Sequence, residues 1–238
     1  MSNKQKGSIL LIPNTLGGES TADIIPQEVI QQATQLRVFA VEEIKSARRL
    51  LRKMDRNFPI DDCTFKILNK NTKESELMDL LLFLIKGIDI GIISEAGCAG
   101  VADPGQILVG IAQEMGVEVK PYLGPNSILL ALMASGMNGQ LFHFHGYLPI
   151  DALERKKKIQ ALEQEMRSST CTQIFIETPY RNNQLLEALL QSCNGSTKIC
   201  IGVDITGPTE WIKTSTVDYW KKNKPELHKK LAVFLIGQ

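Results

Sequence analysis

The stretch Ile92-Ile93-Ser94-Glu95-Ala96-Gly97-Cys98-Ala99-Gly100-Val101-Ala102-Asp103-Pro104-Gly105 decides how this chain folds. A buried strand expected over residues 89–94 runs into a loop of small residues and then into a helix expected over residues 105–115. Ligands of open α/β sheets bind beyond the carboxyl ends of the strands, where small residues let the backbone approach closely. Glu95 could accept a hydrogen bond from an amine or a ribose hydroxyl. Taken alone, the composition of the loop slightly favours a tight turn whose glycines only satisfy positive φ.

A second turn of this kind spans Tyr122-Leu123-Gly124-Pro125-Asn126-Ser127 and precedes an apolar helix that ends at Gly136. Asn126 or Ser127 would make a good N-cap, and the free N–H groups of the helix start could bind a carboxylate. The segment alone favours a plain structural cap. Two strand-to-helix turns in one sheet favour a ligand site.

Short β-like runs alternate with helical stretches on both sides of these turns. Further strands are expected over residues 8–12, 36–41, 64–68, 117–122 and 141–146, with helices over 42–56 and 74–86. This alternation predicts a largely parallel sheet with helices on both faces.

The pattern changes after Tyr147-Leu148-Pro149. Helices are expected over residues 152–166 and 182–191, and strands over 173–177, 198–203, 210–216 and 231–236, which indicates a mixed sheet containing a hairpin. We therefore expect an α/β protein of two domains. Residues 1–148 form the N-terminal α/β domain with the mainly parallel sheet, and residues 149–238 form the C-terminal α/β domain with the mixed sheet.

Composition limits the possible functions. The longest apolar stretch, Leu80 to Ile85, ends at Lys86 and is far shorter than the ~18 residues of a membrane span. The polar start, Met1 to Lys6, has no apolar signal region behind it. We expect a soluble, cytoplasmic protein. The net charge of +1 gives no global attraction to nucleic acid or membranes, although local basic patches could still act.

Metal and nucleotide motifs are missing from the sequence. Five widely spaced cysteines form no Cys-x-x-Cys pair, and His143 and His145 share one face of an expected strand with no third ligand nearby in sequence. We therefore expect no metal site and no disulfide framework. No Walker loop, Gly-x-Gly-x-x-Gly fingerprint or Gly-x-Ser-x-Gly elbow is present, which disfavours nucleotide hydrolysis, standard dinucleotide binding and esterase chemistry.

Together these segments resemble the tetrapyrrole methylase family of S-adenosylmethionine-dependent methyltransferases. The most similar branch methylates a ribose 2′-hydroxyl of a cytidine in small-subunit ribosomal RNA. Its Ser-Asp-Ala-Gly-Thr-Pro-Gly-Ile-Ser-Asp-Pro-Gly is similar to residues 94–105, and its Gly-Pro-Ser-Ala to residues 124–127. Its Phe-x-Gly-Phe-Leu-Pro resembles residues 144–149, and its Tyr-Glu-Ser-Pro-His-Arg resembles residues 176–181. The order and spacing of the segments hold from about residue 8 to the end.

Three segments depart from the family pattern. Its Ala-Glu-Asp-Thr-Arg is replaced by Val41-Glu42-Glu43-Ile44-Lys45, and its first loop, Thr-Pro-Ile-Gly-Asn, by Ile12-Pro13-Asn14-Thr15-Leu16-Gly17-Gly18. A His-Glu-His-Asn-Glu segment of the RNA branch appears as Leu68-Asn69-Lys70-Asn71-Thr72, without either histidine. The cofactor half of the pattern survives better than the substrate half, so the resemblance specifies the reaction type more closely than the substrate.

The resemblance implies that S-adenosylmethionine lies in a cleft between two domains, held largely by backbone groups and without a metal. The implied cofactor-binding positions are Pro13, Glu95, Gly97, Cys98, Asn126, Ser127, Ile176, Val203 and Leu231. Glu43 and Asp103 are candidates for a base, but an exposed loop carboxylate is the favoured interpretation of each, and we assign no catalytic residue. Family members are commonly homodimers, and the apolar stretches 77–84 and 128–133 could supply an interface.

Three functions remain open. The leading hypothesis is methylation of RNA ribose, with basic clusters binding phosphates; the clearest cluster is Lys45, Arg48, Arg49, Arg52 and Arg56. Such clusters are usually solvated helix faces. The enzyme alternative is a methyltransferase of a small molecule such as a tetrapyrrole-like acid. The other alternative is a cofactor-binding protein that has lost catalysis, which the altered first loop and the missing histidines favour.

Overall fold

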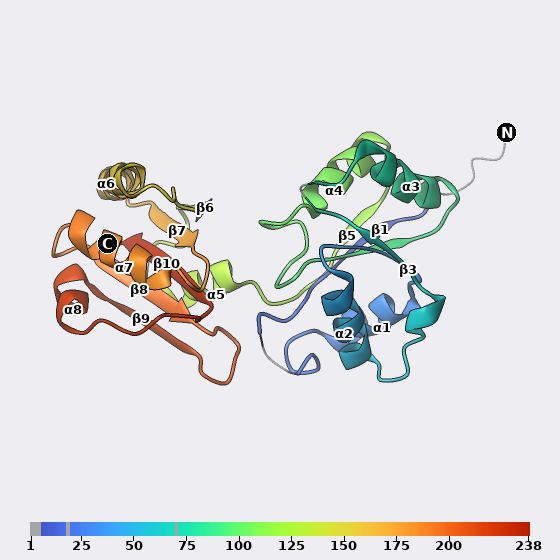
Figure 1. Ribbon diagram of the computed structural model, residues 1–238, viewed down its shortest axis with the longest axis horizontal. Helices are drawn as coiled ribbons and strands as arrows, with labels where there is room; N and C mark the ends of the chain where they lie inside the picture. Colours follow the sequence, from blue (N-terminus) through green and yellow to red (C-terminus); the bar gives the residue numbers. More distant parts are fainter. Residues whose placement is uncertain (1–5, 18–19, 70) are drawn as a thin grey trace. The chain divides into compact units, whose positions relative to one another are not determined.

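The computed structural model describes residues 6–17, 20–69 and 71–238. The chain divides into two compact units, Met1–Asn126 and Ser127–Gln238, which we call the N-terminal and C-terminal units (Figure 1). Parts of three segments quoted above, namely residues 1–5, Gly18 and Lys70, lie outside the described residues. No helix within the described ranges is long and apolar enough to cross a membrane.

The N-terminal unit is built on a parallel sheet of five strands. The strands are β1 (Ile9–Ile12), β2 (Val38–Val41), β3 (Thr64–Ile67), β4 (Ile90–Ile93) and β5 (Val119–Pro121). Their order is β3-β2-β4-β1-β5, and every neighbouring pair is parallel. The strands β2 and β4 are buried along their whole length, as their near-continuous apolar sequences require.

Helices cover both faces of this sheet, as the alternating sequence pattern predicts. They are α1 (Gln27–Gln35), α2 (Ile44–Met54), α3 (Glu74–Ile85) and α4 (Gly105–Glu114), with a short 3-10 turn η1 (Ile60–Asp62). Figure 1 shows α1 and α2 on one side of the sheet and α3 and α4 on the other. On the first side Leu50 packs with Phe39, and on the second Leu108 packs with Ile92.

The strand order creates a switch point between β1 and β4. The two strands are neighbours, yet α1 follows β1 on one face of the sheet and α4 follows β4 on the other. The loops that leave the carboxyl ends of β1 and β4 therefore diverge to opposite faces. In open α/β sheets this divergence leaves the crevice in which ligands bind.

The C-terminal unit contains a mixed sheet, which confirms the expected fold class. Its order is β6-β7-β10-β8-β9; β6 and β7 are parallel and the other pairs antiparallel. The strands are β6 (Phe142–Tyr147), β7 (Thr172–Ile176), β8 (Lys198–Val203), β9 (Trp211–Thr216) and β10 (Ala232–Gly237). The helices are α5 (Ser127–Ser135), α6 (Ala152–Ser169), α7 (Asn182–Ser192) and α8 (Val217–Lys222).

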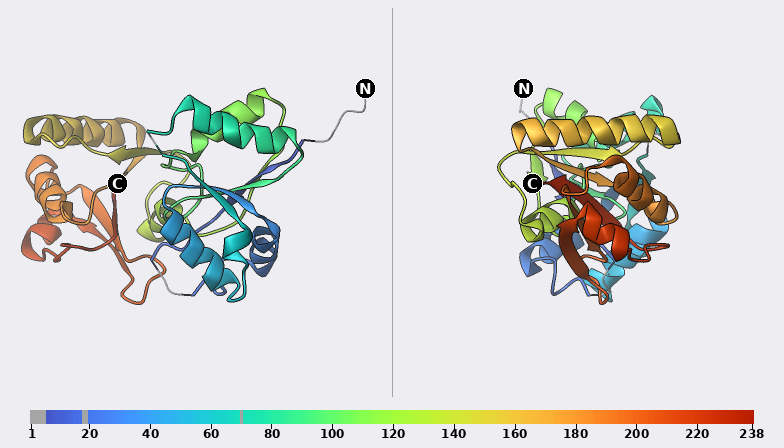
Figure 2. Two further views of the ribbon diagram at one scale, coloured as in Figure 1. Left: turned by 45° about the vertical axis from the view of Figure 1, so that its right-hand side comes forward. Right: turned by 90° about the vertical axis from the view of Figure 1, so that its left-hand side faces the viewer.

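One face of the mixed sheet carries the main core of the C-terminal unit. There Ile159 of α6, Leu189 of α7 and Trp220 of α8 pack with sheet residues such as Phe234. Figure 2 shows α6, the long helix in olive and gold, extended beside the sheet. The helix α5 contacts the opposite face, where Gly202 of β8 lies close to Ala131.

The observed division of the chain differs from the boundary expected near residue 148. The sequence pattern assigned residues 126–146 to the first sheet, because they continue its alternation of helix and strand. In the structure α5 instead packs on β8, β9 and β10, and β6 pairs with β7. The two compact units therefore meet between Asn126 and Ser127.

Candidate functional site

The loops after β1 and β4 are joined at the switch point. The Asn14 amide donates to the Gly97 carbonyl at 2.8 Å, and the Gly97 amide donates back at 3.2 Å. The side-chain amide of Asn14, which is buried, donates to the carbonyls of Ser94 at 3.0 Å and Glu95 at 2.9 Å. Four hydrogen bonds thus hold the first loop and the small-residue loop together.

The loop after β5 packs against the same two segments. The Cys98 thiol lies 3.5 Å from the Pro125 carbonyl. Gly97 has φ of +72°, and a Cβ there would lie 3.2 Å from the Leu16 side chain and 3.4 Å from the Pro125 carbonyl oxygen. A Cβ on Gly124 would lie only 2.1 Å from the Cβ of Pro13. The two glycines are therefore required by backbone conformation and close packing within this rim.

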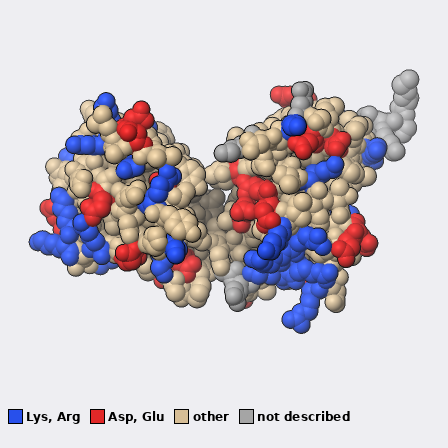
Figure 3. All heavy atoms as spheres, in the orientation of Figure 1, with Lys and Arg blue, Asp and Glu red and all other residues tan. Residues whose placement is uncertain are grey.

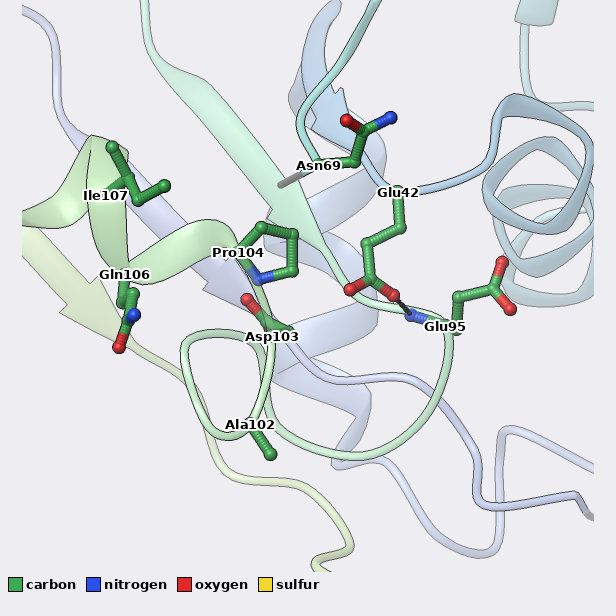
Figure 4. Close-up of a pocket in the computed structure, with 8 residues that line it drawn as sticks. All are labelled: Glu42, Asn69, Glu95, Ala102, Asp103, Pro104, Gln106 and Ile107. Carbon is green, nitrogen blue, oxygen red and sulfur yellow. Dashed lines mark hydrogen bonds between the residues drawn. The ribbon is translucent and has the colours of Figure 1, made fainter. Parts of the chain in front are cut away.

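A pocket of about 610 Å³ opens beside the joined loops. It lies beyond the ends of β2, β3 and β4 and beside the start of α4 (Figure 4). It is lined by Glu42, Asn69, Glu95, Ala102, Asp103, Pro104, Gln106 and Ile107. Three carboxylates and two amides give it many hydrogen-bond acceptors and a negative charge. It suits a ligand with positive charge, amines or hydroxyl groups.

Glu42 is a carboxylate of the pocket with an oxygen to spare. Its Oε2 accepts a hydrogen bond from the Glu95 amide at 3.0 Å (Figure 4). Its Oε1 accepts none from the residues that the structure describes. Burial raises the pKa of Glu42, and the charges of Asp103 and Glu95 raise it further, against the opposing effect of the Glu95 amide. A carboxyl group with a raised pKa in a pocket is a candidate for proton transfer.

Asp103 also lines the pocket, but both of its oxygens are used within the loop. Oδ2 accepts from the Gly100 amide at 2.6 Å, and Oδ1 accepts from the Gly105 amide at 2.5 Å. Burial raises the pKa of Asp103, while these two amides lower it. Ala102, the residue before it, has a backbone φ of 59°, which residues other than glycine rarely adopt. Asp103 therefore shapes the turn that leads into α4.

Glu43, the other candidate base, has a different role. Its carboxylate accepts hydrogen bonds from the Lys45 amide at 2.8 Å and the Ser46 amide at 2.6 Å, which makes it the N-cap of α2. These hydrogen bonds lower the pKa of Glu43, the Lys45 amide contributing most. Among the two successive glutamates after β2, the structure places Glu42 in the pocket and Glu43 at the helix start.

The remaining cofactor positions implied by the sequence are divided between the units. Asn126 is the last residue of the N-terminal unit, and Ser127 begins α5. In the C-terminal unit the other three expected positions meet at one end of the central strands β7, β10 and β8. Ile176 pairs with Val233, Val203 pairs with Ala232, and the carbonyl of Leu231 accepts from the Asp204 amide at 2.9 Å.

The sequence did not predict four polar residues as part of the site, namely Asn14, Glu42, Asn69 and Gln106. Asn14 and Glu42 each lie within two residues of a strand's carboxyl end, a position that itself signals a site in a parallel sheet. Asn69 follows β3 in the same way. Gln106 carries no comparable signal, because it sits within the first turn of α4.

Solved structures with this architecture define the fold class. The methyltransferase CobJ matches with a TM-score of 0.64 at 17% identity, over 98% of this chain and 94% of that one. The native uroporphyrin III C-methyl transferase of Thermus thermophilus matches with a TM-score of 0.59 at 15% identity, over 98% of both chains. A structure of that enzyme complexed with S-adenyl homocysteine matches with a TM-score of 0.56 at 14% identity, over 98% of each chain. The chain thus has the fold of the tetrapyrrole methylases.

Curated relatives specify the family within this class. Ribosomal RNA small subunit methyltransferase I of Vibrio cholerae is 31% identical over 207 residues, which cover 86% of this chain and 67% of the relative. The protein of the same name from Mesorhizobium japonicum is 36% identical over 138 residues, covering 58% of this chain and 46% of the relative. The chain belongs to the ribosomal RNA small subunit methyltransferase I family.

The alignments span about half to two thirds of the relatives' own length. The match to the relative from Halalkalibacterium halodurans, at 31% identity over 185 residues, covers 78% of this chain and 60% of that protein. No protein-family model matches the chain.

Proposed function

We propose that this chain is an S-adenosylmethionine-dependent methyltransferase that methylates a ribose 2′-hydroxyl of small-subunit ribosomal RNA. The observation that supports this most directly is the acidic pocket beside the joined loops of β1, β4 and β5, in a chain that belongs to a ribosomal RNA methyltransferase family. This function places the protein in the cytoplasm, with ribosomal RNA.

The chemistry of the pocket fits the cofactor. S-adenosylmethionine carries a sulfonium and an ammonium group against a single carboxylate, so its net charge is positive at neutral pH. Glu42, Glu95 and Asp103 supply the opposite charge, and Asn69 and Gln106 offer amides to polar edges of the ligand. A bound S-adenosylmethionine would supply an activated methyl group, and the protein would supply alignment and exclusion of water.

The cofactor positions implied by the sequence complete this proposal. In the N-terminal unit we propose contacts from Pro13, Glu95, Gly97, Cys98 and Asn126. The other proposed contacts are Ser127, Ile176, Val203 and Leu231 of the C-terminal unit.

Proton removal from the acceptor hydroxyl is assigned to Glu42. Its Oε1 has no partner among the described residues and lies on the pocket, whereas Asp103 uses both oxygens and Glu43 caps α2. The hydrogen bond from the Glu95 amide holds the carboxylate in place. A positioned carboxylate contributes on the order of 10²- to 10⁴-fold to a proton-transfer step.

A basic helix face next to the pocket favours RNA over a small acceptor. The helix α2 begins directly after Glu42 and Glu43, and Figure 3 shows a dense group of Lys and Arg side chains over this part of the N-terminal unit. The group consists of Lys45, Arg48, Arg49, Arg52 and Arg56. Of these five residues, only Arg48 forms an ion pair with another described residue, at 3.2 Å from the exposed Asp61. The other charges are available to phosphates.

A homodimer is part of the proposal. Apolar side chains on two helices stay exposed, including Met78 and Leu82 of α3 at 50% and 47%, and Leu129 and Met133 of α5 at 47% and 78%. Exposed apolar surface of this kind is commonly covered by a second copy. Sedimentation at micromolar concentration would show a dimer mass, and a monomer mass would contradict this part.

Transfer of a labelled methyl group tests the proposed function. Small ribosomal subunits lacking the modification, free 16S RNA and a tetrapyrrole acid would each be incubated with S-adenosylmethionine labelled in its methyl group. We expect label in the RNA, within dinucleotides that resist alkali, because a 2′-O-methyl group removes the hydroxyl that alkaline cleavage requires. Label in the tetrapyrrole alone would establish the small-molecule alternative. Cofactor binding without transfer to any acceptor would indicate that catalysis is lost.

Substitutions at the two neighbouring glutamates test the role of Glu42. Glu42→Gln should lower the turnover rate at least about 100-fold. Glu43→Gln is the matched control and should reduce stability slightly with little effect on turnover. Equal turnover of the two variants would exclude Glu42 as the base.

A further inference from the structure

Three residues of the C-terminal unit bring together a set of potential metal ligands away from the proposed methyl-transfer pocket. They are His143 of β6, Glu165 of α6 and Cys171, which precedes β7. Their ligand atoms all lie within 4.8 Å of one another. His143 Nδ1 and Glu165 Oε1 are 2.8 Å apart. None of the three has a role in the proposed methyl transfer.

The parallel crossover from β6 to β7 explains why these residues meet. His143 pairs with Gln173 in the sheet, so Cys171 lies just before the start of β7, next to the start of β6. The helix α6 connects the two strands, and Thr170 turns the chain back with φ of 57°. Glu165 lies near the C-terminal end of α6, five residues before Thr170. The three residues thus come from three elements that the fold keeps in contact.

The burial of the three side chains is suited to holding an ion at the surface. Cys171 is buried at 1% exposure and forms no disulfide. The side chains of His143 and Glu165 are about half exposed, at 52% and 40%. An ion could therefore enter from solvent, bind the buried sulfur atom of Cys171 and keep one coordination position open to water.

The ligand set matches zinc. Zinc takes imidazole nitrogen, carboxylate oxygen and thiolate sulfur at about 2.0–2.3 Å, and three protein ligands with one water are common. Neighbouring ligand atoms of a tetrahedral site are roughly 3.3–3.8 Å apart at these bond lengths. Small rotations of the exposed His143 and Glu165 side chains would bring the three atoms to that spacing. Calcium and magnesium are disfavoured, because they require oxygen ligands.

Neighbouring hydrogen bonds orient the cluster. The Gln173 side chain donates to the Cys171 carbonyl at 3.1 Å and lies 2.6 Å from Nε2 of His145. The rings of His143 and His145 meet edge to face with centroids 6.0 Å apart. These contacts hold the backbone of Cys171 in place before any ion binds, while the half-exposed His143 ring remains able to rotate toward the ion.

We propose that His143, Glu165 and Cys171 bind one zinc ion, with water as the fourth ligand. The ion joins the edge strand β6 to the crossover helix and to β7, and it stabilises the C-terminal unit.

Cobalt substitution and zinc titration test the site. The full chain would be stripped with a chelator and titrated with Zn²⁺ against a chromophoric competitor, and separately with Co²⁺. We expect one Zn²⁺ per chain, a rise in Tm with Zn²⁺, and a thiolate-to-cobalt absorption band in the near ultraviolet. The absence of that band, or of any Tm shift at millimolar Zn²⁺, would overturn the proposal.

Variants identify the ligands. Cys171→Ser should abolish the cobalt–thiolate band, and Cys193→Ser, another buried free cysteine of the same unit, should keep it. His143→Asn and Glu165→Gln change half-exposed side chains and should leave the fold intact, while lowering zinc affinity on the order of 100-fold or more. Unchanged zinc affinity in both of these variants would assign the ion to other groups, even if Cys171→Ser fails to fold.

Discussion

The buried side-chain amide of Asn14 donates a hydrogen bond to the backbone carbonyl of Glu95 at 2.9 Å. Asn14 follows β1 and Glu95 follows β4, so this bond connects two loops that diverge to opposite faces of the sheet. The same amide group reaches the Ser94 carbonyl at 3.0 Å. One side chain therefore supplies two of the four hydrogen bonds that join the two loops beside the pocket.

Replacing Asn14 by Ala should loosen the pocket. Two carbonyls would lose a donor in a buried place, at a cost of about 1–3 kcal/mol in the free energy of unfolding. Urea denaturation would measure the stability, and calorimetry would measure the affinity for S-adenosylmethionine, which should fall by at least about tenfold. Asn57→Ala, at an exposed position of the same unit, is the control. Wild-type affinity in Asn14→Ala would show that the joined loops do not position the cofactor.

Adding a methyl group at Gly124 should be more harmful than adding one at Gly110. The new Cβ at position 124 would lie 2.1 Å from the Pro13 Cβ, so the rim must shift, at a cost of about 1–3 kcal/mol. At Gly110, inside α4, nothing lies within 4 Å, and Ala should stabilise the helix by about 0.5–1 kcal/mol. Thermal unfolding of both variants checks the contrast. Equal Tm values would argue against close packing of the rim.

Glu42 should make stability depend on pH in a definite direction. Its folded-state pKa is raised above the ordinary value of 4.5, mainly by burial, so the folded protein binds more protons than the unfolded chain. The Glu42 contribution to the free energy of unfolding therefore decreases as pH rises above about 4.5. Glu42→Gln cannot ionise, so its stability relative to wild type should increase from pH 4.5 to pH 7. Urea denaturation at several pH values measures this difference, and the opposite trend would contradict the raised pKa.

The basic face of α2 should control RNA affinity through salt. Arg49→Ala and Arg52→Ala would each remove one charge available to phosphates. Each should flatten the slope of log affinity against log salt by roughly 0.7–0.9 if the charge contacts a phosphate. Filter binding of small-subunit RNA between low and physiological salt measures the slope. Lys86→Ala, at an exposed position after α3, should leave it unchanged, and an equal loss there would indicate only a general charge effect.

The kinds of elements and most of their positions could be predicted from local patterns. Short apolar runs correspond to β1, β2, β4, β7, β8 and β10, because buried strands require them wherever they lie. Two helices were missed. The helix α1 begins after Pro26 without a side-chain cap and is rich in glutamine, and α8 has only 6 residues. Their apolar signals are too short or too diluted to stand out.

The sequence by itself determined the α/β class, the small-residue loop around Glu95 and Gly97, and the resemblance that the relatives confirm. Only the tertiary structure decided that β6 belongs with β7, that Glu42 and not Glu43 lines the pocket, and that Glu165 and Cys171 lie beside His143. Periodicity along a chain reflects which face of an element is buried. Which loops and side chains meet depends on strand order and crossover connections, and these bring together residues whose separation along the chain carries no signal of contact.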